Sequence, residues 1–258
     1  MRHQHTFDTV AELYADVRPG YPHALIADLA RTAGLLPGDR ILEVGCGAGQ
    51  ATRDLAMLAG SVLALDPGGA LIAQARRRVD GLGDVAFEAV SFENWTMRPG
   101  VFRLVASAQA WHWVDPNVAY ERAAEALAPD GWLAIFGHVP LPPGPKFLGV
   151  FEAVFREVAP ELWGRPTPET WYRPEGPIAG LVARSALFGP VLRRGYGWSQ
   201  ELDAAGYIAL CGTKSYFNVL EPDRRARLFA ALAQAIDERG GRIEVGYETW
   251  LHMAQKLD

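Results

Sequence analysis

Short apolar runs alternate with amphipathic segments through the first half of the chain. The runs are rich in Val, Leu, Ile and Ala, which is typical of buried parallel strands. The pattern predicts strands at 41–44, 61–66, 85–90, 102–108 and 132–137. Between them, apolar residues recur every three or four positions and predict helices at 22–34, 50–60, 71–79 and 118–128. Strands and helices in this alternation indicate βαβ units in a mostly parallel sheet.

Both ends of the chain extend this pattern. A helix is expected at 6–17, before the first strand. In the last quarter, the pattern predicts a strand at 191–198, helices at 201–210 and 223–241, and a final strand at 242–254. We expect the last two strands to pair as a late hairpin, which adds an antiparallel member to the sheet.

Residues 138–190 interrupt the alternation. This segment holds ten of the eighteen prolines of the chain, together with several aromatic residues. Within it, Phe147, Phe151 and Val158 belong to one helical stripe, and a second helix is expected near 176–187. We interpret the segment as a helical insertion folded over the sheet.

Composition narrows the choice of function. The chain has 258 residues, is 49% apolar and carries a formal charge of −5, which favours a globular protein and argues against a nucleic-acid partner. Cys46 and Cys211 stand far apart, so they predict neither a disulfide framework nor a metal site. No apolar run suggests a signal peptide or a membrane span, and a cytoplasmic location is expected.

The stretch "ILEVGCGAGQ" at 41–50 carries the candidate chemistry. Its glycines stand at alternate positions, whereas the dinucleotide fingerprint G-x-G-x-x-G needs its third glycine one residue later. Glu43 occupies a place where a dinucleotide fold normally has an apolar residue. An acid there suits the cationic part of S-adenosylmethionine. Asp66, at the end of the next strand, is suited to ribose hydroxyls, although it would serve NAD equally well.

Several motifs together resemble those of a known family. "ILEVGCGAGQAT", "ALDPGGALIAQAR" and "FEAVSFENW" are similar to the first three motifs of class I, Rossmann-like S-adenosylmethionine-dependent methyltransferases. "VASAQAWHWVDP" and the opening "FDTVAELYADVRPGYP" resemble the methyltransferase type 11, trans-aconitate-methyltransferase-like group. The resemblance implies an α/β fold with a seven-stranded mixed sheet flanked by helices, an N-terminal cap and a helical insertion between strands 5 and 6.

The resemblance also implies a domain organisation. We expect a single domain over 1–258. Its expected parts are the N-terminal cap at 1–35, the cofactor-binding core at 36–137, the substrate lid at 138–190 and the C-terminal part of the sheet at 191–258.

Carried over position by position, the resemblance implies a cofactor site. Its expected residues are Tyr14, Arg18, Tyr21, Glu43, Gly45, Cys46, Gly47, Gly49, Asp66, Pro67, Leu71, Ser91, Phe92, Glu93, Ala108 and Gln109. Ser91 replaces the usual acid of the third motif, so the partner of the adenine amino group stays open between Glu93 and the backbone. A second departure, Phe102-Arg103 in place of Phe-Asp, affects a structural pairing. No metal is expected.

Methyl transfer needs alignment first, and a general base only for weakly acidic acceptors. His112 and His138 lie at the carboxyl edge of the expected sheet. His112 is a candidate base, with packing between its neighbouring tryptophans as the alternative, and His138 is the rival candidate. The candidate substrate-binding residues are Trp111, Trp113, Trp163, Trp171, Tyr172, Lys214 and Tyr216. For Trp111 and Trp113 the alternative is a place in the core, whereas Trp163, Trp171 and Tyr172 are expected in the lid. For Lys214 the alternative is an ordinary solvated side chain.

The sequence thus predicts methyl transfer from S-adenosylmethionine to a small molecule, at O, N or C, with a carboxylate acceptor possible. S-adenosylhomocysteine is the expected product, and a monomer or homodimer the expected state. The alternatives are a protein that binds the cofactor without chemistry and an NAD(P)-dependent oxidoreductase. A nucleic-acid methyltransferase is disfavoured by the charge and by the absence of an Asn/Asp-Pro-Pro-Tyr motif.

Overall fold

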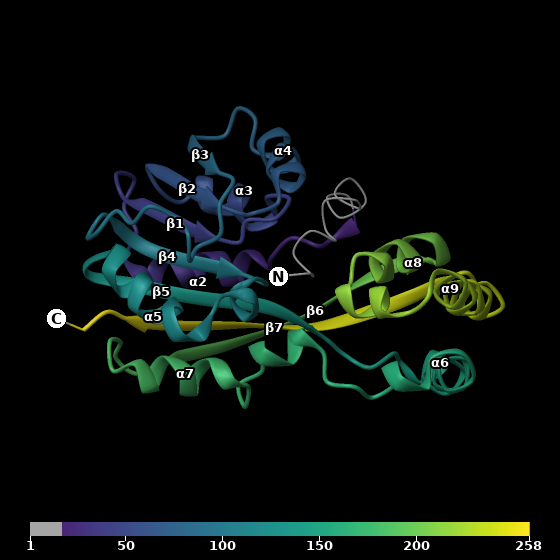
Figure 1. The fold of residues 1–258 in the computed structure, drawn as a ribbon. Helices are drawn as coiled ribbons and strands as arrows, with labels where there is room; N and C mark the ends of the chain where they lie inside the picture. Colours follow the sequence, from purple (N-terminus) through teal and green to yellow (C-terminus); the bar gives the residue numbers. More distant parts are fainter. Residues whose placement is uncertain (1–16, 258) are drawn as a thin grey trace.

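A computed structural model describes residues 17–257, which form a seven-stranded mixed sheet in the order β3-β2-β1-β4-β5-β7-β6 (Figure 1). The strands are β1 (Arg40–Val44), β2 (Ser61–Leu65), β3 (Asp84–Glu88), β4 (Phe102–Ala108), β5 (Leu127–Pro140), β6 (Leu192–Asp203) and β7 (Arg242–Gln255). Strands β1 to β5 pair in parallel, whereas β7 is antiparallel to both β5 and β6. The expected mixed sheet is confirmed, and the predicted helix at 6–17 lies almost wholly outside the described residues.

Helices cover both faces of the sheet. The helices α2 (His23–Ala33), α3 (Gln50–Ala56) and α4 (Gly69–Arg78) lie on one face, where they bury one apolar core. On the opposite face, α5 (Pro116–Ala126) and α7 (Pro177–Ser185) enclose a second core. Strand β1 is buried at every position but Arg40, because helices cover it on both sides.

A helical lobe stands beyond the end of the sheet. Strands β6 and β7 continue past the parallel strands as a two-stranded ribbon (Figure 1). The helices α6 (Pro145–Val158), α8 (Ala204–Gly212) and α9 (Pro222–Asp237) pack around its far end. Phe151, Leu228 and Leu232 are fully buried there, so the lobe has an apolar core of its own.

The insertion between β5 and β6 is confirmed, but its halves lie in different places. Helix α6 belongs to the lobe, whereas the short helix η4 (Pro168–Tyr172) packs against β5 and α7 packs against α5. The other short helices are η2 (Trp111–Trp113), η3 (Pro160–Leu162) and η5 (Ser215–Val219). Residues 138–140, assigned to the lid by sequence, still belong to β5.

Two boundaries predicted from sequence were wrong. Residues 201–203 continue β6 instead of opening a helix, and α8 begins at Ala204 because the Asp203 carboxylate caps it by accepting from the Gly206 backbone N–H at 2.7 Å. The strand predicted at 132–137 begins earlier, at Leu127, and Asp130 within it takes a positive φ of 58° where the strand register shifts. Parallel pairing with β4 already begins at Leu127, opposite Phe102.

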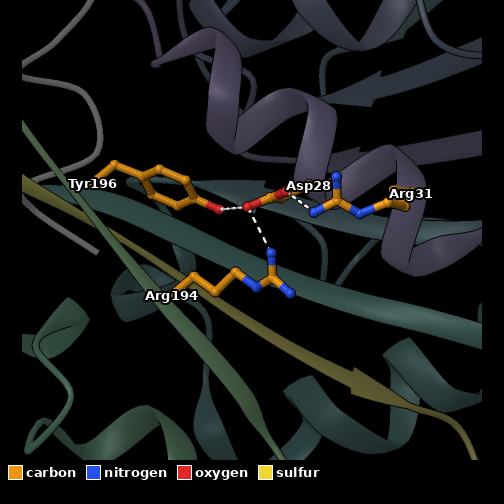
Figure 2. Close-up of polar contacts among 4 residues, drawn as sticks. All are labelled: Asp28, Arg31, Arg194 and Tyr196. Atoms are coloured by element: carbon orange, nitrogen blue, oxygen red, sulfur yellow. Dashed lines mark hydrogen bonds and ion pairs between the residues drawn. The ribbon is translucent and has the colours of Figure 1, made fainter.

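A polar cluster joins α2 to the ribbon (Figure 2). The Asp28 carboxylate accepts from the Tyr196 hydroxyl at 2.7 Å and from Arg194 Nη1 at 2.9 Å, and it also pairs with Arg31. The hydrogen bond from Tyr196, together with that from Arg194, lowers the pKa of Asp28. One carboxylate therefore links a helix that precedes the first strand to the strand at the far edge of the sheet.

Candidate active site

A cavity opens at the carboxyl ends of the parallel strands. The loops that follow β1, β2, β3 and β4 form its floor and sides, and residues 18–21 and His138 complete it. Its volume is about 130 Å³. Ligands of open α/β sheets bind at this edge, where strand order reverses between β1 and β4.

The glycine loop after β1 keeps its backbone close to the neighbouring loops. Gly45, Gly47 and Gly49 have φ angles of +75°, +53° and +85°, a region that side chains disfavour. A Cβ on Gly45 would lie 2.3 Å from the Cβ of Ala110, so the loop after β4 leaves no room for a side chain. The glycines therefore let two loops meet along one wall of the cavity.

Glu43 is a buried acid at the end of β1. Glu43 is 0% exposed and lines the cavity. Neither of its carboxyl oxygens makes a hydrogen bond of good geometry within residues 17–257. Burial raises the pKa of Glu43 to about 8, and the nearby Thr52 hydroxyl opposes this only in part. A buried polar group without a partner is costly, which points to a ligand or water as its partner.

Asp66 fastens two loops of the cavity together. One carboxylate oxygen accepts from the Gly47 backbone N–H at 2.9 Å, and the other accepts from Gly68 N–H at 2.8 Å. A carboxylate has about four lone-pair positions, so it can accept further donors from the cavity.

Most of the predicted cofactor residues line this cavity. They are Arg18, Tyr21, Glu43, Gly45, Cys46, Gly47, Asp66, Pro67, Leu71, Ser91, Phe92, Glu93, Ala108 and Gln109. Gly49 lies beside them as the N-cap of α3, and Tyr14 is outside the described residues. The sequence argument missed Gln50 and Ala110, which adjoin predicted residues in the same turns.

Glu93 and Gln109 are held in place by neighbouring backbone. The Glu93 carboxylate accepts from the Asp115 backbone N–H at 2.9 Å. Gln109 has a φ of 58°, and its side-chain amide accepts from the His138 backbone N–H at 2.6 Å and donates to the His138 carbonyl at 3.2 Å. Gln109 thus joins the ends of β4 and β5.

His138 is packed into the wall of the cavity. Its Nδ1 lies 2.7 Å from the Thr249 hydroxyl, which also accepts from Trp198 Nε1 at 2.7 Å, and the Tyr21 ring stacks on it at 4.5 Å. Burial lowers the pKa of His138 to about 3, with a further contribution from the positive charge of Arg18. The ring is therefore neutral at neutral pH.

A second, smaller cavity adjoins the first. Arg18, Gln109 and Trp113 line both cavities. His112, Pro168, Glu169 and Ser215 complete the second one. It therefore combines the loop after β4 with the insertion and with η5 of the lobe.

Polar contacts organise this second cavity. His112 Nδ1 lies 3.0 Å from the hydroxyl of the buried Tyr172, and burial lowers the pKa of His112 to about 4. Arg18 donates to the Thr213 hydroxyl at 2.9 Å and to the Thr213 carbonyl at 3.1 Å, which ties residue 18 to the lobe.

Glu169 is the charged group of this cavity that sequence reasoning missed. It is only 8% exposed, and its Oε2 has no hydrogen-bond partner within the described part of the chain. Burial raises its pKa, but the positive charges of Lys214 and Arg18 contribute to an opposing effect that leaves the pKa below its usual value. A lone glutamate in a proline-rich segment gave no signal, since only the fold brings it to His112.

The predicted substrate residues are divided among several places. Trp113 lines both cavities, and Lys214 is nearly buried with its amine over the Tyr216 ring. Trp111 packs in the core against Phe92 and Tyr120 and lines neither cavity. Trp163 packs on Phe155 in the lobe, and the ring of Trp171 lies 6.5 Å from that of His112.

Comparison with known proteins identifies this architecture. A solved structure described as a candidate type II methyltransferase from Anaeromyxobacter dehalogenans shares the fold, with a TM-score of 0.67, 22% identity, and coverage of 92% of this chain and 97% of that one. Residues 41–131 match the methyltransferase domain family. These likenesses support a class I S-adenosylmethionine-dependent methyltransferase.

Curated relatives of this chain are described as methyltransferases. An uncharacterized methyltransferase of Mycobacterium tuberculosis is 26% identical over 211 residues, 82% of this chain and 77% of the relative. A probable S-adenosylmethionine-dependent methyltransferase of Saccharomyces cerevisiae is 28% identical over 149 residues, 55% of this chain and 48% of that one. The trans-aconitate-like subgroup stays a prediction.

The described residues hold neither a membrane-spanning helix nor a metal-binding cluster. No helix within residues 17–257 is long and apolar enough to cross a membrane. In the same part of the chain, no group of three or more His, Cys, Asp or Glu side chains is placed to hold a metal ion. Cellular location, oligomeric state and the division into cap, core and lid stay predictions.

Proposed function

We propose that this methyltransferase binds S-adenosylmethionine in the larger cavity and transfers its methyl group to a small molecule in the adjoining one. The observation that carries the proposal is the buried carboxyl of Glu43, which faces the larger cavity without a hydrogen-bond partner in the described structure. S-adenosylmethionine brings an ammonium group and a sulfonium, and a carboxylate stabilises such positive charge.

The residues present fit this cofactor. Glu43 and the glycine loop would hold the methionyl part, because they line the cavity and the glycines place no side chain in it. Asp66 would accept hydrogen bonds from the ribose. Residues 91–93, with Pro67 and Leu71, would enclose the adenine. When bound, the cofactor supplies a methyl group on a positively charged sulfur, which makes that methyl carbon electrophilic.

The protein contributes mainly alignment. Holding two reactants in line can lower a barrier by roughly 7–11 kcal/mol. The cavities share Arg18, Gln109 and Trp113, so an acceptor in the second lies directly beside a cofactor in the first. His112 and His138, with pKa values of about 4 and about 3, are neutral near pH 7, and we assign them to positioning rather than to strong base catalysis.

A small acceptor is supported by the size of the site and by one structural neighbour. Phosphoethanolamine N-methyltransferase 2 of Haemonchus contortus, solved with phosphomonomethylethanolamine and S-adenosylhomocysteine, has a TM-score of 0.56 and 17% identity. It covers 97% of this chain, which in turn covers 58% of it. That protein binds a small amine, and the second cavity here is likewise compact.

Calorimetric titration tests the cofactor assignment. We expect S-adenosylhomocysteine to bind with one site per chain, and NAD and NADP to give no saturable heat. The titration is repeated with Glu43→Gln, which keeps the size of the side chain but removes its charge; a loss of affinity of about tenfold or more is expected. Binding of NAD alone, or an unchanged affinity in Glu43→Gln, would contradict the proposal.

A further inference from the structure

Glu169 lines the second cavity and has a buried carboxylate oxygen without a hydrogen-bond partner in the described residues. It lies on η4, which packs against β5, so the fold fixes its position. The residue is 92% buried by accessible area, being 8% exposed, and it lines the cavity together with His112, Trp113 and Ser215. Its Oε2 has no partner within residues 17–257. A buried carboxylate oxygen in this position requires a donor to stabilise it.

The groups around Glu169 keep it ionised and leave one carboxylate oxygen without a hydrogen bond. Burial raises its pKa, but the positive charge of Lys214, a hydrogen bond from the Thr167 side chain, the residue's own backbone and the positive charge of Arg18 together bring the pKa below its usual value. The ion pairs of the described structure include none between Glu169 and either residue within 4.0 Å. The carboxylate is therefore stabilised by local hydrogen bonds and by distant positive charge, and its Oε2 has no donor of its own within the described residues.

We infer that Glu169 binds an N–H or O–H group of the methyl acceptor, so the acceptor is an amine, alcohol or phenol. The inference rests on the proposed function and names its substrate class. An ionised carboxylate only accepts hydrogen bonds, so its partner must donate one. An acceptor that entered as a carboxylate would place a second negative charge beside Glu169, which is unfavourable, and its binding would depend on Arg18, which lines the same cavity. The carboxylate acceptor suggested by sequence is thus the competing outcome.

The test uses three probes that differ in one group. 2-Phenylethylamine, 2-phenylethanol and phenylacetate share a phenyl ring, which suits a cavity lined by Trp113. Each is titrated by calorimetry into the full chain saturated with S-adenosylhomocysteine. We expect the amine or the alcohol to bind about tenfold more tightly than phenylacetate, the effect of one hydrogen bond to a charged group.

Variants then assign the preference to Glu169. Glu169→Gln should bring the three dissociation constants within about threefold of one another, because the charge is gone. Glu169→Asp keeps the charge on a shorter side chain and should retain a weaker preference. Glu175→Gln is the matched control: it lies in the same insertion but is 68% exposed, and it should behave like the unmodified protein.

The outcomes separate this inference from the proposed function. Failure of the unmodified protein to bind S-adenosylhomocysteine would overturn the proposed function itself. With that binding intact, equal or tighter binding of phenylacetate would overturn the inference, as would an unchanged preference in Glu169→Gln or no binding of any probe. The preference in the unmodified protein decides the matter even where a variant fails to fold.

Discussion

The parallel half of the sheet and the β6–β7 ribbon are built on different principles. Strands β1, β2 and β3 have five residues each, and every one leads into a loop at the same edge. The ribbon strands have twelve and fourteen residues and run beyond the sheet into the helical lobe (Figure 1). The parallel half therefore places its loops side by side at one edge of the sheet, whereas the ribbon packs with the helices of the lobe around a separate apolar core.

This difference separates the two sides of the active site. The larger cavity is formed chiefly by loops of the parallel half, which lie at the ends of short strands. The second cavity is lined in part by Glu169 of the insertion and by Ser215 of the lobe. We therefore expect changes in the parallel half to affect cofactor binding, and changes in the lobe to affect stability or acceptor binding.

The largest effect on cofactor binding is expected from Gly45→Ala. Its Cβ would lie 2.3 Å from that of Ala110, so the loop must move. We expect the dissociation constant of S-adenosylhomocysteine to rise at least about a hundredfold in a calorimetric titration. Gly81→Ala is the control, because Gly81 has the same φ of +75° but nothing within 4 Å of the new Cβ. Equal affinities in the two variants would refute the steric explanation.

Phe151→Ala tests whether the lobe is energetically separate from the cofactor site. Phe151 is 0% exposed in the core of the lobe, and its truncation should cost about 3–5 kcal/mol in the free energy of unfolding. Leu148→Ala on the same helix removes a side chain that is 40% exposed and should cost about 0.5 kcal/mol or less. Urea denaturation measures both. The affinity for S-adenosylhomocysteine should change less than about twofold, and a larger change would show that the regions are coupled.

The pH dependence of cofactor binding tests the role of Glu43. Burial raises the pKa of Glu43 to about 8 in the free protein, so the carboxyl is protonated at pH 6 and 7. A bound ammonium group favours the ionised form, and binding then releases a proton. Affinity should therefore rise with pH, by up to about tenfold per unit below pH 8, and level off above it. Glu43→Gln should abolish this component, and calorimetry in buffers of different ionisation enthalpy counts the proton.

The same group sets a second pH dependence, in the stability of the free protein. Because the pKa of Glu43 in the folded state lies above its usual value of 4.5, the folded state binds the proton more tightly. Protonation of Glu43 therefore stabilises the folded state; this contribution to the free energy of unfolding is complete below about pH 4.5 and is lost as pH rises through about 8. Thermal unfolding at pH 5 and pH 8 should show a smaller difference in Glu43→Gln.

The smallest effect is expected at the link between the two regions. Asp28→Asn weakens the bonds from α2 to Arg194 and Tyr196 of β6 (Figure 2). Since the cluster is partly exposed, we expect a loss of about 1 kcal/mol or less in the free energy of unfolding, decreasing with added salt. Tyr196→Phe, which removes one of the hydrogen bonds, serves as the comparison. A loss well above that of Tyr196→Phe combined with no salt dependence would argue against an ionic link.

Sequence reasoning recovered the parallel half best. Predicted strands such as 41–44 and 61–66 fall within one residue of β1 and β2. The predicted glycine loop, Glu43 and Asp66 also line the larger cavity, because each belongs to a short motif of neighbouring residues that can be recognised in the sequence. The ribbon was less predictable. The pattern at 201–203 predicted the start of a helix, but in the structure these residues belong to β6, which pairs with β7 over twelve positions.

Local patterns in the chain thus specify the order of strands and helices and the loops that enclose the larger cavity. Those features depend on local periodicity and on turns at strand ends, which neighbouring residues encode. Long-range packing, in contrast, brings η4 back to the sheet while α6 joins the lobe, and it places Glu169 in the same cavity as His112 and Ser215. These contacts join residues far apart in the chain, and their energies come from burial and charge in three dimensions, which no local pattern records.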